Sequence, residues 1–209
     1  VDLSESDVEK LEELVNSWVK HVISSKGSKA FNPPYNASER VFSIGRFLLN
    51  NPKIVDETIG KKLIAIAVSD LNFVASNLEW HLLGNHLLKN LLSLAWGSLL
   101  FDSATRPEWE ALVDKKLPPV LAEQIGPDGM HYELSPMYHN NALLDLLDIL
   151  NLRPANTKFS FINSTTKQML GASQVVTHCD GDIAFFNDCS LNNLPSSQHI
   201  IAYGEALCG

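Results

Sequence analysis

The stretch "GNHLLKNLLSLAWGSLLFD", residues 84–102, is the most apolar run of the chain. Its apolar residues fall on most sides of a helix, whereas a surface helix needs only one apolar stripe. We therefore expect a core helix that is buried on more than one side. One line of it is polar or small, because His86, Asn90, Ser93 and Gly97 share a helical face. This line predicts that the core helix borders a cleft.

Helical patterns continue on both sides of this stretch. The expected helices cover about residues 6–24, 36–50, 53–77, 107–124, 136–150 and 160–176. Short loops and almost no strand predict an all-α array of helical hairpins, with residues 1–209 as one helical domain. Residues 177–209 form a less regular tail that ends in a short helix.

Three local signals refine the helix ends. Asn36 or Ser38 is expected to cap the second helix. Pro118 and Pro119 should break or kink the helix that contains them. Ser135, directly before a proline, reads as a helix N-cap. Residues 25–38, with Gly27, Pro33 and Pro34, are predicted as a loop that leads into the second helix, and residues 151–157 as a linker.

Composition excludes several classes of protein. The chain has 209 residues, with 45% hydrophobic and 19% charged residues, which is typical of a globular protein. A net charge of −8 argues against a nucleic-acid partner, which needs clustered lysine and arginine. No apolar run approaches about 18 residues, so no membrane span is expected. The start at Val1 carries no secretory signal, which fits a trimmed start as well as a cytoplasmic origin.

Cysteine and histidine spacing predicts no metal site. Cys179 and Cys189 are close enough in sequence for a disulfide, but we favour three free thiols, because Cys208 leaves the count odd. No pair has the spacing of a zinc finger or a helical zinc protease. No phosphate loop or dinucleotide fingerprint occurs either, so no cofactor is expected.

Two segments gather polar residues without an obvious structural need: "NHLLKN", residues 85–90, and "DGMHYELSPMYHNN", residues 128–141. A loop that leads into a helix start suits a site, because free backbone amides and polar side chains point into one space. Structural alternatives stay open. On these alternatives, Asn85 only caps the core helix, His86 is a core histidine whose hydrogen bonds are satisfied within the protein, and Tyr138 only packs its ring in the core. Asp145 and Asp148 read as a solvated helix face.

These segments also resemble a known family. The pieces "PYNASERVFSIGRFLL", "GNHLLKNLLSLAWGSLLF", "EQIGPDGMHYELSPMYHNNALLDLLDILN" and "THCDGDIAFFND" occur in the order found in the N-terminal domain of the heparinase II/III-like family, which includes oligoalginate lyases. The resemblance covers nearly the whole chain. It implies an incomplete (α/α) toroid of helical hairpins, followed in the family by a β-sandwich domain.

The resemblance implies β-elimination at a uronic acid of an acidic polysaccharide or oligosaccharide. By position, Asn85 and His86 would neutralise the uronate carboxylate, and Tyr138 would protonate the leaving oxygen and act also as the base. Such donors stabilise the charge that develops on the carboxylate. A tyrosine whose pKa is lowered by nearby cations suits this role. The weaker candidates for substrate binding are Arg40, Lys89, Glu133 and His139.

Two departures from the family pattern matter. Lys89 stands where family members often have an acidic residue, giving "NHLLKN" in place of "NHLLEN". The family also draws a catalytic histidine from its β-sandwich, whereas this chain ends at Gly209, and early toroid helices are missing before Val1. We therefore expect a fragment that binds substrate weakly and turns over little alone. Measurable lyase activity of the isolated chain would contradict this.

Two other functions compete with the lyase. One is a non-catalytic module that binds glycan or serves as a scaffold in polysaccharide metabolism; the other is a helical protein–protein module. A single cleft shared by Asn85, His86 and Tyr138 would favour the lyase.

Apolar flanks of a truncated toroid would promote self-association. A periplasmic or secreted location is favoured over a cytoplasmic one. The sequence names neither the uronate, the linkage nor the mode of cleavage.

Overall fold

The computed structural model describes residues 4–24, 33–82, 84–152, 159–190 and 193–208. Residues 25–32 of the predicted loop and 153–157 of the predicted linker lie outside these ranges, and the rest of the predicted loop overlaps the start of a helix at Pro34. The described residues form eight α-helices and a 3-10 helix. They are α1 (Glu5–Ser24), α2 (Pro34–Asn50), η1 (Pro52–Ile54), α3 (Thr58–Ser76), α4 (Gly84–Leu100), α5 (Arg106–Gln124), α6 (Pro136–Leu152), α7 (Ile162–Val175) and α8 (Ser197–Cys208). The all-α prediction is confirmed.

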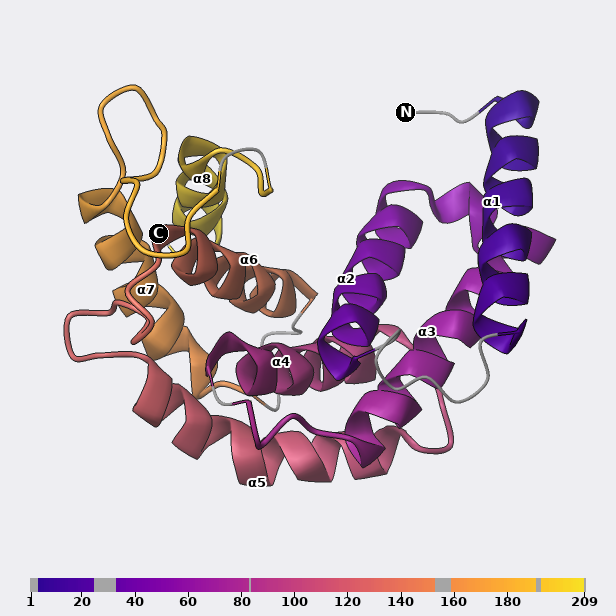
Figure 1. The fold of residues 1–209 in the computed structure, drawn as a ribbon, viewed down its shortest axis with the longest axis horizontal. Helices are drawn as coiled ribbons and strands as arrows, with labels where there is room; N and C mark the ends of the chain where they lie inside the picture. Colours follow the sequence, from indigo (N-terminus) through magenta and orange to yellow (C-terminus); the bar gives the residue numbers. More distant parts are fainter. Residues whose placement is uncertain (1–3, 25–32, 83, 153–158, 191–192, 209) are drawn as a thin grey trace.

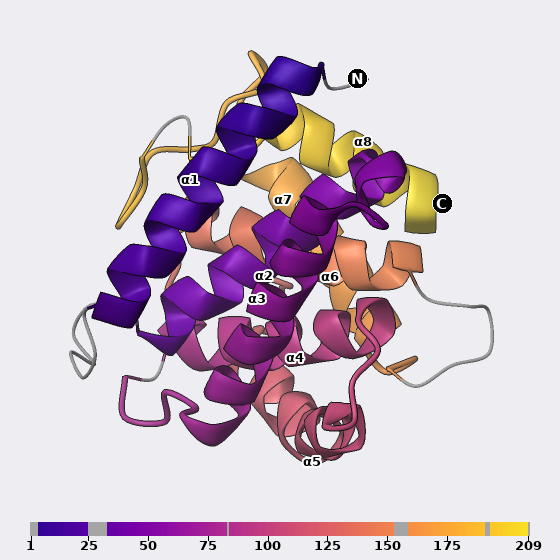
Figure 2. The same ribbon diagram turned by 90° about the vertical axis from the view of Figure 1, so that its right-hand side faces the viewer.

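The helices form two layers of an open arc (Figures 1 and 2). The inner layer contains α2, α4, α6 and α8, and each of these helices contacts the next. The outer layer contains α1, α3, α5 and α7, which run behind the inner helices. Because successive helices alternate between the layers, the chain builds helical hairpins around an incomplete toroid, as predicted.

The core helix α4 lies at the centre of the arc (Figure 1). It contacts α2, α3, α5 and α6, and its residues from Leu87 to Ser98 are all buried. Burial on several sides is therefore confirmed. The prediction that its polar line faces a cleft is wrong for most of that line. Asn90 and Ser93 are fully buried and bond to Ser38 of α2, so they form an internal polar seam between the two helices.

Two expected helix ends differ from the structure. Helix α2 begins at Pro34, with no side-chain cap, because a proline at the first position has no amide that needs a partner. Helix α5 continues through Pro118 and Pro119 without a break. The carbonyls that these prolines leave without a helical donor belong to Asp114 and Lys115, which are exposed and can bond to water.

The tail agrees in outline with the prediction. An isolated antiparallel bridge joins Thr177 to Ile183, and α8 follows from Ser197. Helix α8 packs on α6 and α7, which places the segment before it beside the amino-terminal half of α6. This segment therefore forms a wall next to the predicted site.

Candidate functional site

A cleft of about 700 Å³ lies between α2 and α6. Its size is within the range of about 300–1,000 Å³ that is typical of ligand sites. It is lined by Tyr35, Glu39, Ser43, Arg46 and Asn50 of α2, by Met137, Tyr138, Asn141, Leu144 and Asp148 of α6, and by Asn193, Leu194 and Pro195 of the tail. The cleft thus combines phenols, carboxamides and apolar groups with few charges.

The loop before α6 holds the amino end of α4. The Asn85 amide donates to Oε1 of Glu133 at 2.7 Å, and the Gly84 amide donates to the phenol oxygen of Tyr132. Gln124 donates a further hydrogen bond to the Gly84 carbonyl at 2.8 Å. Amides in the first turn have no partner within the helix, and the positive end of the helix attracts a carboxylate. Glu133 therefore acts here as a cap of α4.

His86 is fixed from two sides but still reaches solvent. Its Nδ1 lies 3.3 Å from Oε1 of Glu79, and its ring centroid lies 4.6 Å from that of Tyr35. Glu79 is buried and also bonds to Asn90, so the carboxylate cannot move freely. The side chain of His86 is 39% exposed. When Nδ1 donates to Glu79, Nε2 is the atom left for a ligand.

Tyr138 lies in the first turn of α6, whose N-cap is Ser135 as predicted, since Oγ accepts the Tyr138 amide at 3.3 Å. The phenol is half-buried and lines the cleft. Burial and the charges of Asp188 and Glu133 raise its pKa above the ordinary value. The expectation of a lowered pKa is wrong, because carboxylates rather than cations surround the ring. Tyr138 stays protonated at neutral pH, which suits a proton donor.

Two residues connect the amino end of α4 with Tyr138. Tyr35 contacts His86, with the two ring planes tilted by 40°, and lines the same cleft as Tyr138. Glu133 bonds to the Asn85 amide, and its charge also acts on Tyr138. Tyr138 is therefore linked to His86 through Tyr35 and to the Asn85 backbone through Glu133, while Asn85 and His86 are not among the residues that line the cleft.

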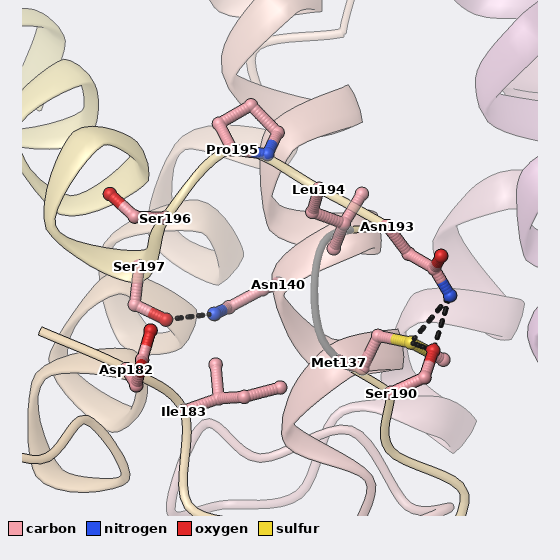
Figure 3. A pocket seen from close by; sticks show the side chains of 10 residues that line it. All are labelled: Met137, Asn140, Asp182, Ile183, Ser190, Asn193, Leu194, Pro195, Ser196 and Ser197. Atoms are coloured by element: carbon pink, nitrogen blue, oxygen red, sulfur yellow. Dashed lines mark hydrogen bonds between the residues drawn. The ribbon is translucent and has the colours of Figure 1, made fainter.

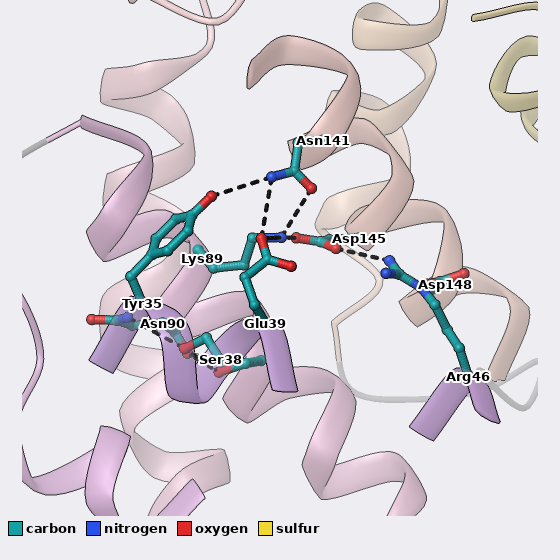
Figure 4. A network of polar contacts seen from close by, with 10 residues as sticks. Tyr35, Ser38, Glu39, Arg46, Lys89, Asn90, Asn141, Asp145 and Asp148 are labelled. Carbon is teal, nitrogen blue, oxygen red and sulfur yellow. Dashed lines mark hydrogen bonds and ion pairs between the residues drawn. The ribbon is translucent and has the colours of Figure 1, made fainter. Parts of the chain in front are cut away.

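Lys89 is the centre of a buried network below the cleft (Figure 4). Only 4% of its side chain is exposed. Its Nζ pairs with Asp145, lies 2.9 Å from Oε1 of Glu39 and donates to Oδ1 of Asn141 at 3.0 Å. Asn141 in turn bonds to the Tyr35 hydroxyl at 3.3 Å. Lys89 thus joins α4 to both cleft walls, and its charge is balanced inside the protein.

Arg46 makes a second bridge from α2 to α6. Its Nε donates to Asp148 at 2.7 Å and its Nη2 donates to Asp145 at 3.1 Å (Figure 4). Asp145 is fully buried, and burial raises its pKa to about 6 although Lys89 and Arg46 oppose the shift. The prediction that Asp145 and Asp148 form a solvated helix face is therefore wrong. Both carboxylates tie α6 to its neighbours.

Two predicted substrate-binding residues lie away from the cleft between α2 and α6. Arg40 is held by both oxygens of Asp70, at 2.8 and 3.0 Å, and covers the Trp18 ring in a groove between α1, α2 and α3. His139 is fully buried and directed at α7, where Nε2 lies 3.0 Å from the Met169 carbonyl. Its Nδ1 accepts the His131 amide. The hydrogen bonds of Arg40 and His139 therefore go to other residues of the protein, away from the cleft.

The turn at Gly84 gives a prediction about stability. Gly84 has a φ of +61°, and a Cβ there would overlap Oε1 of Glu133. We expect Gly84→Ala to lower the free energy of unfolding by about 1–3 kcal/mol. The matched control is Gly171→Ala in α7, where no atom lies within 4 Å of the new Cβ, and which should raise stability by about 0.4–1 kcal/mol. Urea unfolding measures both, and equal effects would contradict the account of Gly84.

A smaller cavity of about 110 Å³ adjoins the cleft (Figure 3). It shares Met137 and residues 193–195 with the cleft, so the tail forms the wall between the two. Asn140 lies at its base and donates to Ser197 at 2.9 Å. The remaining polar groups are mainly hydroxyls, together with the Asp182 carboxylate.

Sequence reasoning missed several residues of this site. Tyr35 lies within the resemblance but carries no local signal of its own, because only the fold places it against His86. Glu79 lies in an irregular segment before the core helix. It contacts His86, seven positions later in the sequence, and bonds to Asn90, eleven positions later. Asp145 could have been found from the predicted burial of α4. A buried α4 places Lys89 inside the protein, and a buried charge needs a partner of opposite charge.

Three further findings concern metal ligands, membrane spans and cysteines among the described residues. No three histidine, cysteine or acidic side chains among them cluster so as to hold a metal ion. Within the same ranges, every helix is too short or too polar to cross a membrane. Cys179, Cys189 and Cys208 are free thiols.

Comparison with known proteins agrees with this architecture. Residues 35–198 match the family described as Heparinase II/III N-terminus. The fold is similar to that in the crystal structure of heparinase III, with a TM-score of 0.61 and 18% identity over 88% of this chain and 31% of that chain. The chain thus spans just under a third of that protein, and at this identity the likeness concerns the fold alone. No curated protein sequence matches it significantly. On the family match, which covers well over half of its length, the chain belongs to the heparinase II/III N-terminus family.

Proposed function

We propose that this chain is the helical part of a polysaccharide lyase that binds a uronic-acid-containing polysaccharide for β-elimination. One observation carries the proposal: Tyr138 lines a ligand-sized cleft together with Tyr35, which contacts His86, and it lies within reach of the charge of Glu133, which accepts the Asn85 amide at the amino end of α4. Family membership supports a glycan-related role, and the geometry supplies the residues.

The side chains have the properties that the reaction requires. Removal of the proton beside the uronate carboxylate moves negative charge onto that carboxylate. The Asn85 carboxamide would donate a hydrogen bond to it, and so would His86 in its imidazolium form, with Nδ1 donating to Glu79 and Nε2 donating to the substrate. Such preorganised donors are typically worth about 3–4 kcal/mol each in the transition state.

Tyr138 would then complete the elimination as the acid. Its raised pKa keeps the phenol proton available for the leaving oxygen as the glycosidic bond breaks and the carbon–carbon double bond forms. The same raised pKa makes it a poor base at neutral pH. We therefore assign proton removal to a group outside the described residues, in keeping with the catalytic histidine that the family's β-sandwich supplies.

Binding to variants tests the proposal. We expect Asn85→Ala and His86→Ala each to weaken the binding of an unsulfated acidic tetrasaccharide by roughly 10–100-fold, because each removes a hydrogen bond to a charged group. Tyr138→Phe should change binding by less than about threefold. The matched control is His81→Ala, since His81 is exposed and precedes α4. Isothermal titration measures all four, and unchanged binding in Asn85→Ala and His86→Ala would reject the site.

A non-catalytic glycan-binding or scaffold role is the alternative. It is favoured by the internal pairing of Lys89 and Arg46, which leaves little free positive charge for a transition state. Because proton removal is assigned to a group outside the described residues, product formation discriminates between the two only when the chain is assayed joined to a β-sandwich domain of the family. Unsaturated product that appears with the parent sequence in that protein and disappears in Tyr138→Phe supports the lyase. Binding without any product in that protein supports the alternative.

A further inference from the structure

We infer that Tyr35 is a positioning residue of the proposed site: its ring holds the imidazole of His86 in the orientation that presents Nε2 to an acidic sugar. This inference rests on the proposed function and deepens it, because it gives a role to a side chain in the first turn of α2. Tyr35 acts on the glycan only through His86, so its effect disappears when His86 is absent.

A single hydrogen bond leaves the ring of His86 free to turn. Its Nδ1 lies 3.3 Å from Oε1 of Glu79, and 39% of the side chain is exposed. The terminal torsion of a histidine is broad, so the imidazole can rotate and carry Nε2 away from a ligand. The centroid of the Tyr35 ring lies 4.6 Å from that of His86, with the planes tilted by 40°. Tyr35 therefore blocks this rotation on one side.

The turn of α2 that carries Tyr35 is itself fixed on α4. Tyr35, Ser38 and Glu39 have the i, i+3, i+4 spacing of one helical face. The buried hydroxyl of Ser38 accepts Nδ2 of Asn90 at 3.3 Å, and Oε1 of Glu39 lies 2.9 Å from the Nζ of Lys89. The backbone of Tyr35 is therefore held against the helix that carries His86.

The far end of the Tyr35 side chain is anchored on α6 (Figure 4). Its hydroxyl accepts Nδ2 of Asn141 at 3.3 Å and donates its proton to Glu39. Asn141 is held in turn by Lys89, whose Nζ donates to Oδ1 at 3.0 Å. Because both ends of Tyr35 have partners, its ring is in place before a ligand enters, which is what a positioning residue requires.

The two phenols of the cleft have different roles. Burial and the charges of Glu39 and Asp145 hold the pKa of Tyr35 far above its ordinary value. Its proton is bonded to Glu39 and is therefore not available to a leaving oxygen. Tyr138 remains the acid of the proposed reaction, whereas Tyr35 acts through its ring.

The first test is binding of the unsulfated acidic tetrasaccharide to variants of the whole chain. Tyr35→Leu removes the ring and should weaken binding by about tenfold, because His86 must then be ordered on binding. Tyr35→Phe restores the ring and should return the affinity to within about threefold of the parent. Isothermal titration measures both variants, and circular dichroism checks that they are folded.

The matched control is Tyr203→Leu in α8. The Tyr203 hydroxyl bonds to Asp148 of the same charged network at 3.2 Å, but Tyr203 does not line the cleft. Its loss should change binding by less than about threefold. An equal loss of affinity in Tyr203→Leu and Tyr35→Leu would mean that binding responds to any damage to the network, and would overturn the inference.

A double-mutant cycle separates positioning from direct contact with the glycan. In a chain that already carries His86→Ala, Tyr35→Leu should weaken binding further by less than about threefold, because no imidazole is left to position. Two losses that multiply would mean that Tyr35 contacts the glycan itself or only supports the fold. Either result would overturn the inference.

The tautomer of His86 gives a second readout that needs no ligand. In alkaline solution an imidazole is neutral and carries one proton. In the parent chain and in Tyr35→Phe, the ¹⁵N resonances of the ring should place this proton on Nδ1, where Glu79 accepts it. In Tyr35→Leu they should show a mixture of both tautomers. A single tautomer in all three proteins would mean that Glu79 alone orients the ring, which would overturn the inference.

The outcomes separate the inference from the proposed function. If His86→Ala weakens binding and Tyr35→Leu does not, or if the two losses multiply, the inference is overturned and the proposed function stands. If neither Asn85→Ala nor His86→Ala changes binding, the proposed site is rejected and the inference with it. A loss in Tyr35→Leu that disappears in the His86→Ala chain supports both.

Discussion

Replacing Lys89 by methionine should lower the free energy of unfolding by about 3–5 kcal/mol, one of the two largest effects that we expect from this chain. The ammonium group pairs with Asp145, whose side chain is fully buried, and with Glu39. Without Lys89, Asp145 keeps only Arg46 as a cationic partner. A buried carboxylate that has lost its partner costs more than the pair itself contributes.

Two further variants isolate this effect. The matched control is Lys61→Met in α3, since Lys61 is exposed, and it should change stability by less than about 0.5 kcal/mol. The double variant Lys89→Met with Asp145→Leu removes the charged pair and should recover most of the loss, because apolar replacement of a buried pair is often neutral. Urea unfolding gives all three values. A loss below about 1 kcal/mol in Lys89→Met would contradict the role of Lys89.

Acidification should destabilise the protein through two neutral histidines. His131 and His139 are fully buried next to each other, and burial lowers the pKa of each to about 4. In the unfolded chain both would titrate near 6.5. The unfolded state therefore takes up protons first as the pH falls. The stability contributed by the neutral rings is complete above pH 6.5 and is lost between about 6.5 and 4.

This loss should reach up to about 3 kcal/mol for each ring. Asp145 acts in the opposite direction, since its raised pKa favours the folded state as the pH falls, so the net loss is smaller than the sum. The histidine part is isolated by His139→Gln, which keeps a donor for the Met169 carbonyl. Urea unfolding between pH 7 and 4.5 should show a weaker pH dependence in this variant. An unchanged dependence would mean that the buried pair is not its source.

The histidine pair also bears on the site. His131 lies two residues before Glu133 and accepts the Glu133 amide at 3.4 Å. The same loop presents Glu133 and Tyr132 to the amino end of α4. Protonation of either histidine would therefore disturb the segment that connects Asn85 with Tyr138. We expect glycan binding and stability to decline over the same range of pH.

Most of the helices could be predicted from the sequence, because periodicity is a local property, whereas their arrangement in an incomplete toroid was implied by the resemblance to a known family. The all-round apolar character of α4 predicted its burial, and Ser135 predicted the start of α6. The polar line on α4 was misread. Asn90 and Ser93 find partners on α2, and a residue pattern alone does not reveal whether a polar line meets water or another polar side chain.

The charges of the site could not be predicted in the same way. Lys89 and Asp145 are 56 positions apart in the sequence, and each looks like an ordinary exposed residue until the fold brings them together. The choice of Arg40, Lys89, His86 and His139 as site residues took no account of the side chains that they contact in the fold. In the structure Arg40 and Lys89 are paired with carboxylates, and His139 is buried. The charge of a site therefore cannot be inferred from the charged residues in the sequence, because the fold decides which of them are paired.

The most direct test of the central claim is a nuclear magnetic resonance titration of the chain with an unsulfated acidic tetrasaccharide. The side-chain signals of Asn85 and His86 and the ring signals of Tyr138 should shift together and fit one dissociation constant. Those of His81, which is exposed near the start of α4, should not move. The claim that Asn85, His86 and Tyr138 form one glycan site would be contradicted if these three stay unchanged while other signals shift.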